Sequence, residues 1–323
     1  MTGPPAVVVL SHRLGAVLPA AAAGLLRDGA ALYTDADVPA ELAQLCGAHP
    51  VGDAVQGLLL TLDPDTGAAA RWVANGVPVL DTPEPVGAAL LDAVAVMDRL
   101  RSPGGCPWDA EQTHRSLMPY LIEETYELYQ ALEDGDTDAL REELGDVLLQ
   151  VLFHARVAQE TREGFGVDAV ADGLVAKLVA RHPHVFAGSE QVQTAADQEI
   201  RWEQLKRIEK RRESSVDGVS LSQPAVALAA KLVSRTARAA LPADLLPRAD
   251  GVGGTTGDNG GIGASLFALS AAAKLSGEDP EAALRSVARR FVDDVRAAER
   301  SAREAGLDTG RLTAQQWREH WPA

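Results

Sequence analysis

The alternation of hydrophobic and polar residues divides the chain into a mixed first part and a longer helical part. Short apolar runs of the kind that form buried strands occur at 6–10, 57–62 and 77–80. A further strand is expected near Ala31 in the run ALYTD, and the apolar segment 17–29 before it predicts a helix. Residues 1–85 are therefore expected to form a small α/β segment.

From Val86 onward the apolar residues recur with helical spacing. Proline and glycine residues at 103–107 forbid a continuous helix through the loop 101–113. After the helix at 86–100, four further helices are expected, at 114–134, 137–161, 167–182 and 195–212. Asp136 or Thr137 is suited to cap the helix that begins there. We interpret residues 86–213 as one helical domain, which makes the protein mainly α.

A second helical unit is expected at 224–305, followed by a C-terminal tail at 306–323. Its longest helix should begin at Asp279, with Pro280 at the first helical position. The Gly-rich segment 248–263 is typical of a flexible loop.

A weak internal repeat relates the two helical units. The segment 261–277 aligns with 143–159 and keeps its apolar pattern. It has Gly261 and Ala264 where the first copy has Glu143 and Asp146. We interpret the second copy as a degenerate repeat that retains the apolar packing positions and has lost the two acidic residues and their chemistry.

The composition indicates a folded protein whose main partner is not a nucleic-acid polymer. A chain of 323 residues with 46% hydrophobic residues can bury the core of about two domains. A net charge of −16 disfavours nucleic-acid polymers. The two cysteines, Cys46 and Cys106, fit no metal-binding spacing and are expected to be reduced. No secretory signal or membrane-spanning run is found, so we expect a cytoplasmic protein without a membrane partner.

The strongest chemical feature is a set of carboxylates inside otherwise apolar helical patterns. The set comprises Glu123, Glu124 and Glu127 in one predicted helix, and Glu143 with Asp146 in the next. Glu124 interrupts a stripe of leucines, because it lies three residues after Leu121 and four before Leu128. Glu143 stands in the same relation to Leu140 and Val147. The stripes predict the buried faces: Leu117, Leu121, Leu128 and Leu132 on one helix, and Leu140, Leu144, Val147, Leu148 and Val151 on the next.

The short connection between the two helices predicts antiparallel packing, which brings the carboxylates together. Like charges gathered in this way repel one another unless a cation lies between them. Oxygen ligands from Glu124, Glu127, Glu143 and Asp146 indicate Mg²⁺, with Mn²⁺ as a substitute, rather than Zn²⁺. The alternative is an ordinary solvated helix face.

Other polar residues near this segment are given no metal role. We interpret Glu133, Asp134 and Asp138 as acids of a solvated turn. His154 lies two turns beyond Asp146 and is expected to be a packed or surface histidine.

At these residues the chain resembles the MazG nucleoside triphosphate pyrophosphohydrolases of the all-α NTP pyrophosphatase superfamily. The resemblance covers about residues 90–212. It rests on the acidic pattern and on GGCPWDAEQTHRSLMPYLIEETYEL, ELGDVLLQVLFHAR, KLVARHPHVF and RWEQLKRIEK, in that order. The 224–305 region resembles the second MazG domain of longer members, without its acidic motifs. The first 85 residues faintly resemble a tetrapyrrole methylase domain, but SHRLG replaces the Gly-rich cofactor turn, so no methyl donor is assigned.

The resemblance implies an all-α helical bundle and a Mg²⁺-dependent reaction. NTP and water give nucleoside monophosphate and pyrophosphate, in nucleotide-pool housekeeping. Glu123 is the candidate to orient or deprotonate the attacking water. The resemblance also implies phosphate-binding and nucleotide-binding residues, which are Lys177, Arg181, Trp202, Lys206 and Trp108. Each of these has an ordinary alternative: a solvated helix face for the basic residues, and a core or interface position for the tryptophans.

The resemblance further implies a homodimer, because family members pair helices across subunits. Apolar residues on more than one face of the helix at 137–161 suit burial on both sides. One alternative function is a narrower pyrophosphatase, acting on dUTP, dCTP, an oxidised nucleotide or phosphoribosyl-ATP. The other is a non-catalytic nucleotide-binding regulator.

Overall fold

The computed structural model describes residues 4–53, 55–188, 194, 201, 213–247 and 261–322. The chain divides into two compact units, Met1–His182 and Pro183–Ala323. Within the described residues, every helix is too short or too polar to span a bilayer. Apart from Arg201, the predicted helix at 195–212 lies outside the described residues, as do Trp202, Lys206 and most of the Gly-rich segment at 248–263.

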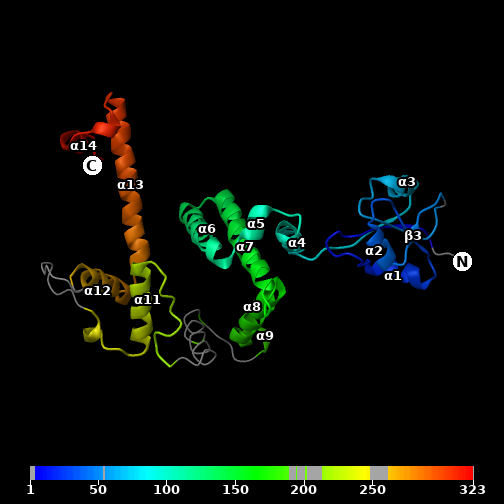
Figure 1. Cartoon of the computed structure of the whole chain (residues 1–323), viewed down its shortest axis with the longest axis horizontal. Helices are drawn as coiled ribbons and strands as arrows, with labels where there is room; N and C mark the ends of the chain where they lie inside the picture. Colours follow the sequence, from blue (N-terminus) through cyan, green and yellow to red (C-terminus); the bar gives the residue numbers. More distant parts are fainter. Residues whose placement is uncertain are drawn as a thin grey trace. The chain divides into compact units, whose positions relative to one another are not determined.

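The first unit begins with a five-stranded parallel sheet (Figure 1). Its strands, in the spatial order β3-β2-β4-β1-β5, are β1 (Ala6–Val9), β2 (Leu32–Thr34), β3 (His49–Pro50), β4 (Leu58–Thr61) and β5 (Val79–Asp81). Val8 of β1 pairs with Leu60 of β4 on one side and with Leu80 of β5 on the other. The α/β character predicted for this segment is confirmed, and among the strands only the two-residue β3 had no counterpart in the prediction.

Helices cover both faces of this sheet, because successive strand residues point to opposite sides. On one face Val8 and Leu60 pack with residues of α1 (Ala20–Arg27) and α2 (Ala40–Leu45). On the other face Val7 and Leu59 pack against Trp72 of α3 (Gly67–Ala74). Of these three helices, only α1 was predicted from the sequence.

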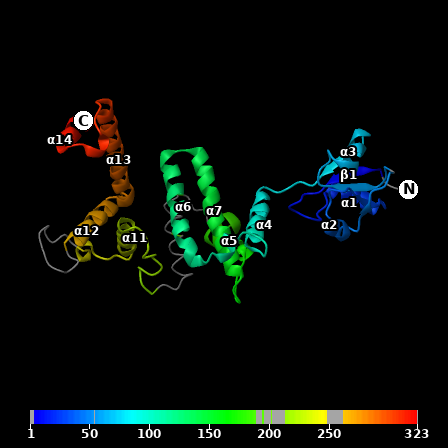
Figure 2. The ribbon, with the colours of Figure 1, turned by 45° about the horizontal axis from the view of Figure 1, so that its top comes forward.

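The helical part of the first unit is built around an antiparallel hairpin of α6 (His114–Asp134) and α7 (Thr137–Gln159) (Figure 2). Thr113 caps α6 through the N–H of Ser116, and Gly135, with φ +67°, ends it. Asp136 caps α7, as predicted. The remaining helices are α4 (Ala89–Arg101), α5 (Pro107–Glu111) and α8 (Val167–Arg181).

The predicted buried face of the hairpin is wrong in part, since Leu132, Leu144 and Val151 are exposed. Leu132 lies in the last turn of α6, two residues before the helix ends at Asp134. The second half of α7 instead buries Leu152 and Phe153, which pack with Met97 of α4.

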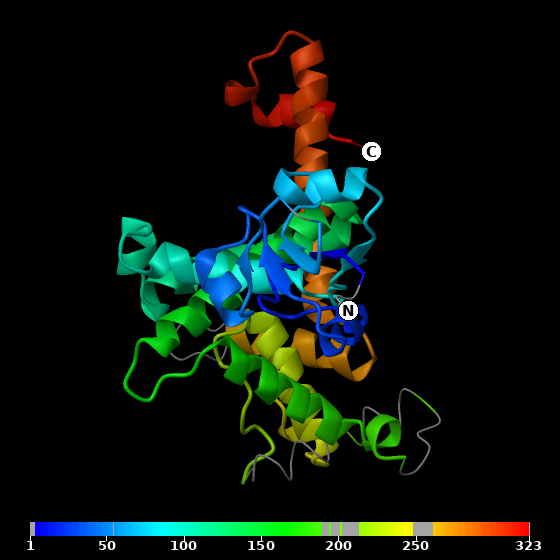
Figure 3. The ribbon, with the colours of Figure 1, turned by 90° about the vertical axis from the view of Figure 1, so that its right-hand side faces the viewer.

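The second unit contains α9 (Pro183–Phe186), α11 (Ala225–Arg238), η1 (Ala243–Leu245), α12 (Ile262–Leu275), α13 (Pro280–Glu304), η2 (Thr309–Arg311) and α14 (Ala314–His320). Asp279 caps α13 with Pro280 in its first turn, as predicted. The residues after 305 include α14, which folds back along the second half of α13 (Figure 3). There Phe291 packs against Trp321, with ring centroids 5.9 Å apart.

Candidate metal and nucleotide site

Three carboxylates meet between α6 and α7. Glu124, Glu127 and Glu143 each present one oxygen, and these oxygens all lie within 4.8 Å of one another. Glu124 and Glu127 share a face of α6 because they are three residues apart, and the antiparallel hairpin brings Glu143 of α7 to the same level. The structure therefore brings together three of the four carboxylates for which a metal role is predicted.

Asp146 acts on this cluster through its charge. Burial raises the pKa of Glu124, and the negative charges of Asp146 and Glu127 raise it further. Burial and the charges of Glu127 and Asp146 likewise raise the pKa of Glu143. Each carboxylate is therefore less stable as an anion than it would be alone in water.

The donor set fits a divalent cation. The cluster offers only carboxylate oxygens, which are the ligands of hard ions such as Mg²⁺, Mn²⁺ and Ca²⁺. A cation between the oxygens would remove the repulsion that raises these pKa values.

Glu123 lies at the edge of the cluster. It is exposed on α6, and its charge contributes to the raised pKa of Glu124. Its position gives it access to solvent next to the carboxylates that a cation would bind.

Trp108 lies within an aromatic group that adjoins the acidic cluster. Its ring meets Tyr120 of α6 edge-on at 6.0 Å and Phe153 of α7 edge-on at 6.4 Å. Tyr120 is four residues before Glu124, and so one turn away on the same helix. Trp108 is about half exposed, so part of its surface remains available to a ligand. The sequence interpretation named neither Tyr120 nor Phe153, although the spacing from Tyr120 to Glu124 is a signal that could have found the first.

Two of the predicted phosphate-binding residues, Lys177 and Arg181, lie on α8, outside the three-carboxylate cluster. Lys177 is exposed, and its ammonium group makes no hydrogen bond or ion pair within the part of the chain that the structure describes. Arg181 is buried at the C-terminal end of the same helix.

A polar stripe continues along α7 beyond the acids. Gln150 follows Asp146 by one turn and is 4% exposed, and its Oε1 has no hydrogen-bond partner among the described residues. His154 follows by another turn and stacks on His114, with Nδ1 atoms 2.8 Å apart. The second ring nitrogen of His154 is buried without a partner in the described structure. His154 is therefore packed, which is one of the two outcomes expected for it. The four-residue spacing after Asp146 could have indicated Gln150.

Comparison with protein families gives two matches. Residues 112–186 match the MazG nucleotide pyrophosphohydrolase domain, a range that contains the acidic cluster. Residues 5–80 match the MazG N-terminal domain, a range that contains the sheet.

Known relatives extend the likeness over nearly the whole chain. The chain is 40% identical to the nucleoside triphosphate pyrophosphohydrolase of Mycobacterium tuberculosis, over 98% of this chain and 94% of that one. It is also 40% identical to the nucleoside triphosphate pyrophosphohydrolase of Mycolicibacterium smegmatis, over 98% and 95%. The nucleoside triphosphate pyrophosphohydrolase/pyrophosphatase MazG of Thermotoga maritima is 34% identical over 71% of this chain and 93% of its own.

Proposed function

The chain belongs to the MazG family of nucleoside triphosphate pyrophosphohydrolases, and we propose that it hydrolyses ribo- and deoxyribonucleoside triphosphates in a Mg²⁺-dependent reaction. The products would be a nucleoside monophosphate and pyrophosphate, and the role would be housekeeping of the nucleotide pool. The observation that carries the proposal is the convergence of Glu124, Glu127 and Glu143 within 4.8 Å. Mn²⁺ would be able to substitute for Mg²⁺, because it takes the same ligands.

The clustered carboxylates would bind the cation, and Glu123 would accept the proton of the attacking water. Mg²⁺ bound by Glu124, Glu127, Glu143 and Asp146 would neutralise phosphate oxygens and lower the pKa of water bound to it. Glu123 would orient the attacking water and accept its proton as the water oxygen bonds to the α-phosphorus. The bond from the α-phosphorus to the oxygen that bridges it to the β-phosphorus then breaks, and pyrophosphate leaves.

The remaining parts of the nucleotide would be bound by aromatic and basic residues. Trp108 would offer its exposed ring to the base, since it is held beside Tyr120 one turn from Glu124. Lys177 and Arg181 of α8 would contact phosphates, as would Lys206, with Trp202 near the nucleotide.

We further propose that the active form is a homodimer. Met118, Ile122 and Leu132 of α6 are each more than half exposed and lie on one face of the helix. Nearly all of α8 is exposed as well, although it carries Val170, Leu174 and Leu178. Exposed apolar faces are typical of interfaces and support this proposal, because a second copy of the hairpin would bury them.

A nucleotide panel tests the proposed reaction. The purified chain is incubated with the eight common NTPs and dNTPs, in Mg²⁺ and in EDTA, and both products are identified. We expect monophosphate and pyrophosphate with Mg²⁺ and neither product with EDTA. Release of orthophosphate instead of pyrophosphate, or no release from any nucleotide, would overturn the proposal. Turnover of only one nucleotide, such as dUTP or dCTP, would overturn the broad specificity.

A further inference from the structure

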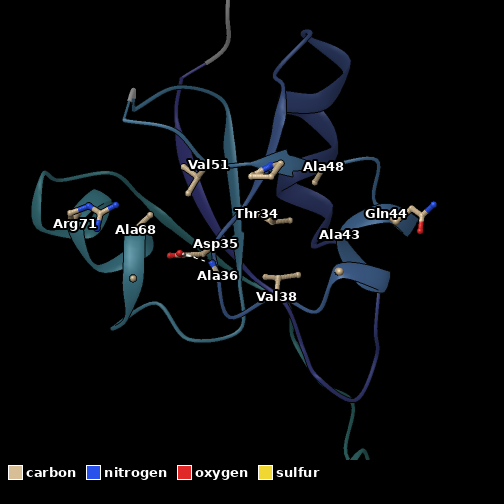
Figure 4. A pocket seen from close by; sticks show the side chains of 13 residues that line it. Thr34, Asp35, Ala36, Val38, Ala43, Gln44, Ala48, Val51, Ala68 and Arg71 are labelled. Atoms are coloured by element: carbon tan, nitrogen blue, oxygen red, sulfur yellow. Dashed lines mark hydrogen bonds between the residues drawn. The ribbon is translucent and has the colours of Figure 1, made fainter.

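We propose that the N-terminal α/β domain holds a second ligand site, at the carboxyl end of β2 between α2 and α3, which binds a nucleoside monophosphate. A cavity of about 740 Å³ lies there (Figure 4). Its volume falls within the range of about 300–1,000 Å³ that is usual for small-molecule sites. Ligands of open parallel sheets bind outside the carboxyl ends of the strands, which is where this cavity lies.

Asp35 provides a fixed acceptor in the wall of this cavity. It is the first residue after β2 and is only 6% exposed. Its Oδ1 accepts the N–H of Ala36 at 2.8 Å, and its Oδ2 accepts the N–H of Ala69 in α3 at 2.7 Å. A carboxylate has about four acceptor positions, so each oxygen keeps one for a ligand.

The first turn of α3 is shaped to meet this carboxylate. Gly67 has φ +57°, and a Cβ there would lie 2.6 Å from both oxygens of Asp35. Only glycine therefore allows the helix to approach so closely. The position of Asp35 is set by the backbone on both sides and does not depend on a mobile side chain.

Arg71 provides a cation on the same side of the cavity. It lies on α3, four residues after Gly67, and its guanidinium makes no hydrogen bond or ion pair within the described ranges. The side-chain amide of Gln44 of α2 also makes no hydrogen bond within the described ranges. It lies on the opposite side of the cavity from Arg71 (Figure 4). Between these polar residues the lining is apolar and includes Val38, Val51 and Ala68.

This lining fits the three parts of a nucleoside monophosphate. An acidic side chain in α/β dinucleotide folds accepts the ribose hydroxyls, and Asp35 offers the same group here. A guanidinium binds phosphate through two parallel hydrogen bonds, which is the role of Arg71. The apolar wall accepts the face of a base. The turn after β1 is not glycine-rich, with Ser11, His12 and Arg13 in it, so the phosphate is assigned to Arg71 rather than to that turn.

Calorimetry on the full chain in EDTA tests this site apart from the proposed catalytic one. AMP, GMP, CMP and UMP are titrated separately, with inorganic phosphate as a further probe. We expect at least one monophosphate to bind, and Arg71→Ala to weaken it at least tenfold. Arg27→Ala, which removes an exposed arginine of α1 outside the cavity, should leave the affinity unchanged. Glu124→Gln should also leave it unchanged, because the acidic cluster takes no part.

Several outcomes would overturn the inference. These are the absence of binding by every monophosphate, a loss of binding in Glu124→Gln, unchanged binding in Arg71→Ala, and phosphate binding as tightly as the nucleotide. Arg71 is exposed, so its replacement leaves the fold intact, which circular dichroism verifies. A second variant, Asp35→Asn, should weaken ribonucleotides more than phosphate. The titration measures binding and does not require catalysis. If the chain failed to hydrolyse nucleoside triphosphates, the test of the monophosphate site would therefore still stand.

Discussion

A carboxylate oxygen of Glu124 on α6 lies within 4.8 Å of one on Glu143 of α7, and Glu127 completes the group. Burial and the charge of Asp146 raise the pKa of both residues, so the fold holds these anions against their mutual repulsion. Proteins retain such arrangements where a cation offsets the repulsion.

Replacing Glu124 by glutamine should separate catalysis from stability. We expect kcat for NTP hydrolysis to fall by about 10²-fold or more, since a metal ligand is lost. In EDTA the melting temperature should hold or rise, because one of the repelling charges is gone. Glu163→Gln, at an exposed position in the turn after α7, is the control and should change neither quantity. A lower melting temperature with normal turnover would instead indicate a purely structural metal site.

The hairpin that carries these residues could be predicted closely from the sequence. Its boundaries follow from local chemistry, since Thr113 caps α6, Gly135 ends it and Asp136 caps α7. Glu124 and Glu143 were identified because they interrupt apolar stripes. Such signals lie within one or two helical turns, where a pattern in the sequence determines which residues share a face.

Contacts between distant segments could not be predicted in this way. α2 has only six residues, too few for helical periodicity to appear. Trp108 meets Phe153 only because α5 turns back onto α7. The cavity beside Asp35 depends on how closely α3 approaches β2, which a single glycine permits. The exposure of Leu144 and Val151 also depends on which neighbours pack against α7, and the stripe alone does not show this.

A charge on the exposed stripe of α6 should disrupt assembly. Met118→Glu places a carboxylate where the proposed partner subunit packs, so we expect the dimer to dissociate at concentrations where the parent chain is dimeric. Sedimentation velocity measures the change. Leu45→Glu, which alters an exposed apolar residue of α2, is the matched control and should leave the mass unchanged. A parent chain that is monomeric, or a Met118→Glu chain that dimerises normally, would contradict the proposed interface.

The stacked histidines should make stability depend on pH. Burial and the neighbouring His114 lower the pKa of His154, so the folded state favours the neutral ring. A lowered pKa gives stability that is present above the unfolded value of about 6.5 and is lost as the pH falls towards the folded value. The melting temperature should therefore drop as the pH is lowered from about 7.5 to 5.

His154→Phe should reduce that drop, because phenylalanine keeps an aromatic ring beside His114 and cannot be protonated. Thermal melts over the same pH range measure it. His49→Phe, at an exposed position of β3, is the control and should retain the drop seen in the parent chain. An equal drop in His154→Phe would exclude the histidine pair as its source.

Trp108 should affect nucleotide binding more than the chemical step. Stacking of a base on an aromatic ring is worth about 1–3 kcal/mol, so Trp108→Ala should raise KM by about 5- to 150-fold with little change in kcat. Trp108→Phe should restore most of the affinity, because it preserves a stacking surface. Trp317→Ala, in α14, is the control. An unchanged KM in Trp108→Ala would mean that the ring only packs against Tyr120 and Phe153.

Glu123 should prove separable from the metal ligands beside it. It is assigned the proton rather than the metal, and its charge acts on Glu124, so Glu123→Gln should lower the Mg²⁺ affinity measured by calorimetry much less than Glu124→Gln does. Loss of a general base lowers the rate by about 10²–10⁴-fold, and we expect kcat to fall within that range. The acidic limb of the pH–rate profile should flatten as well, since that limb reports protonation of the base. If Mg²⁺ affinity fell in parallel with kcat, Glu123 would be a metal ligand, and the base would have to be sought elsewhere.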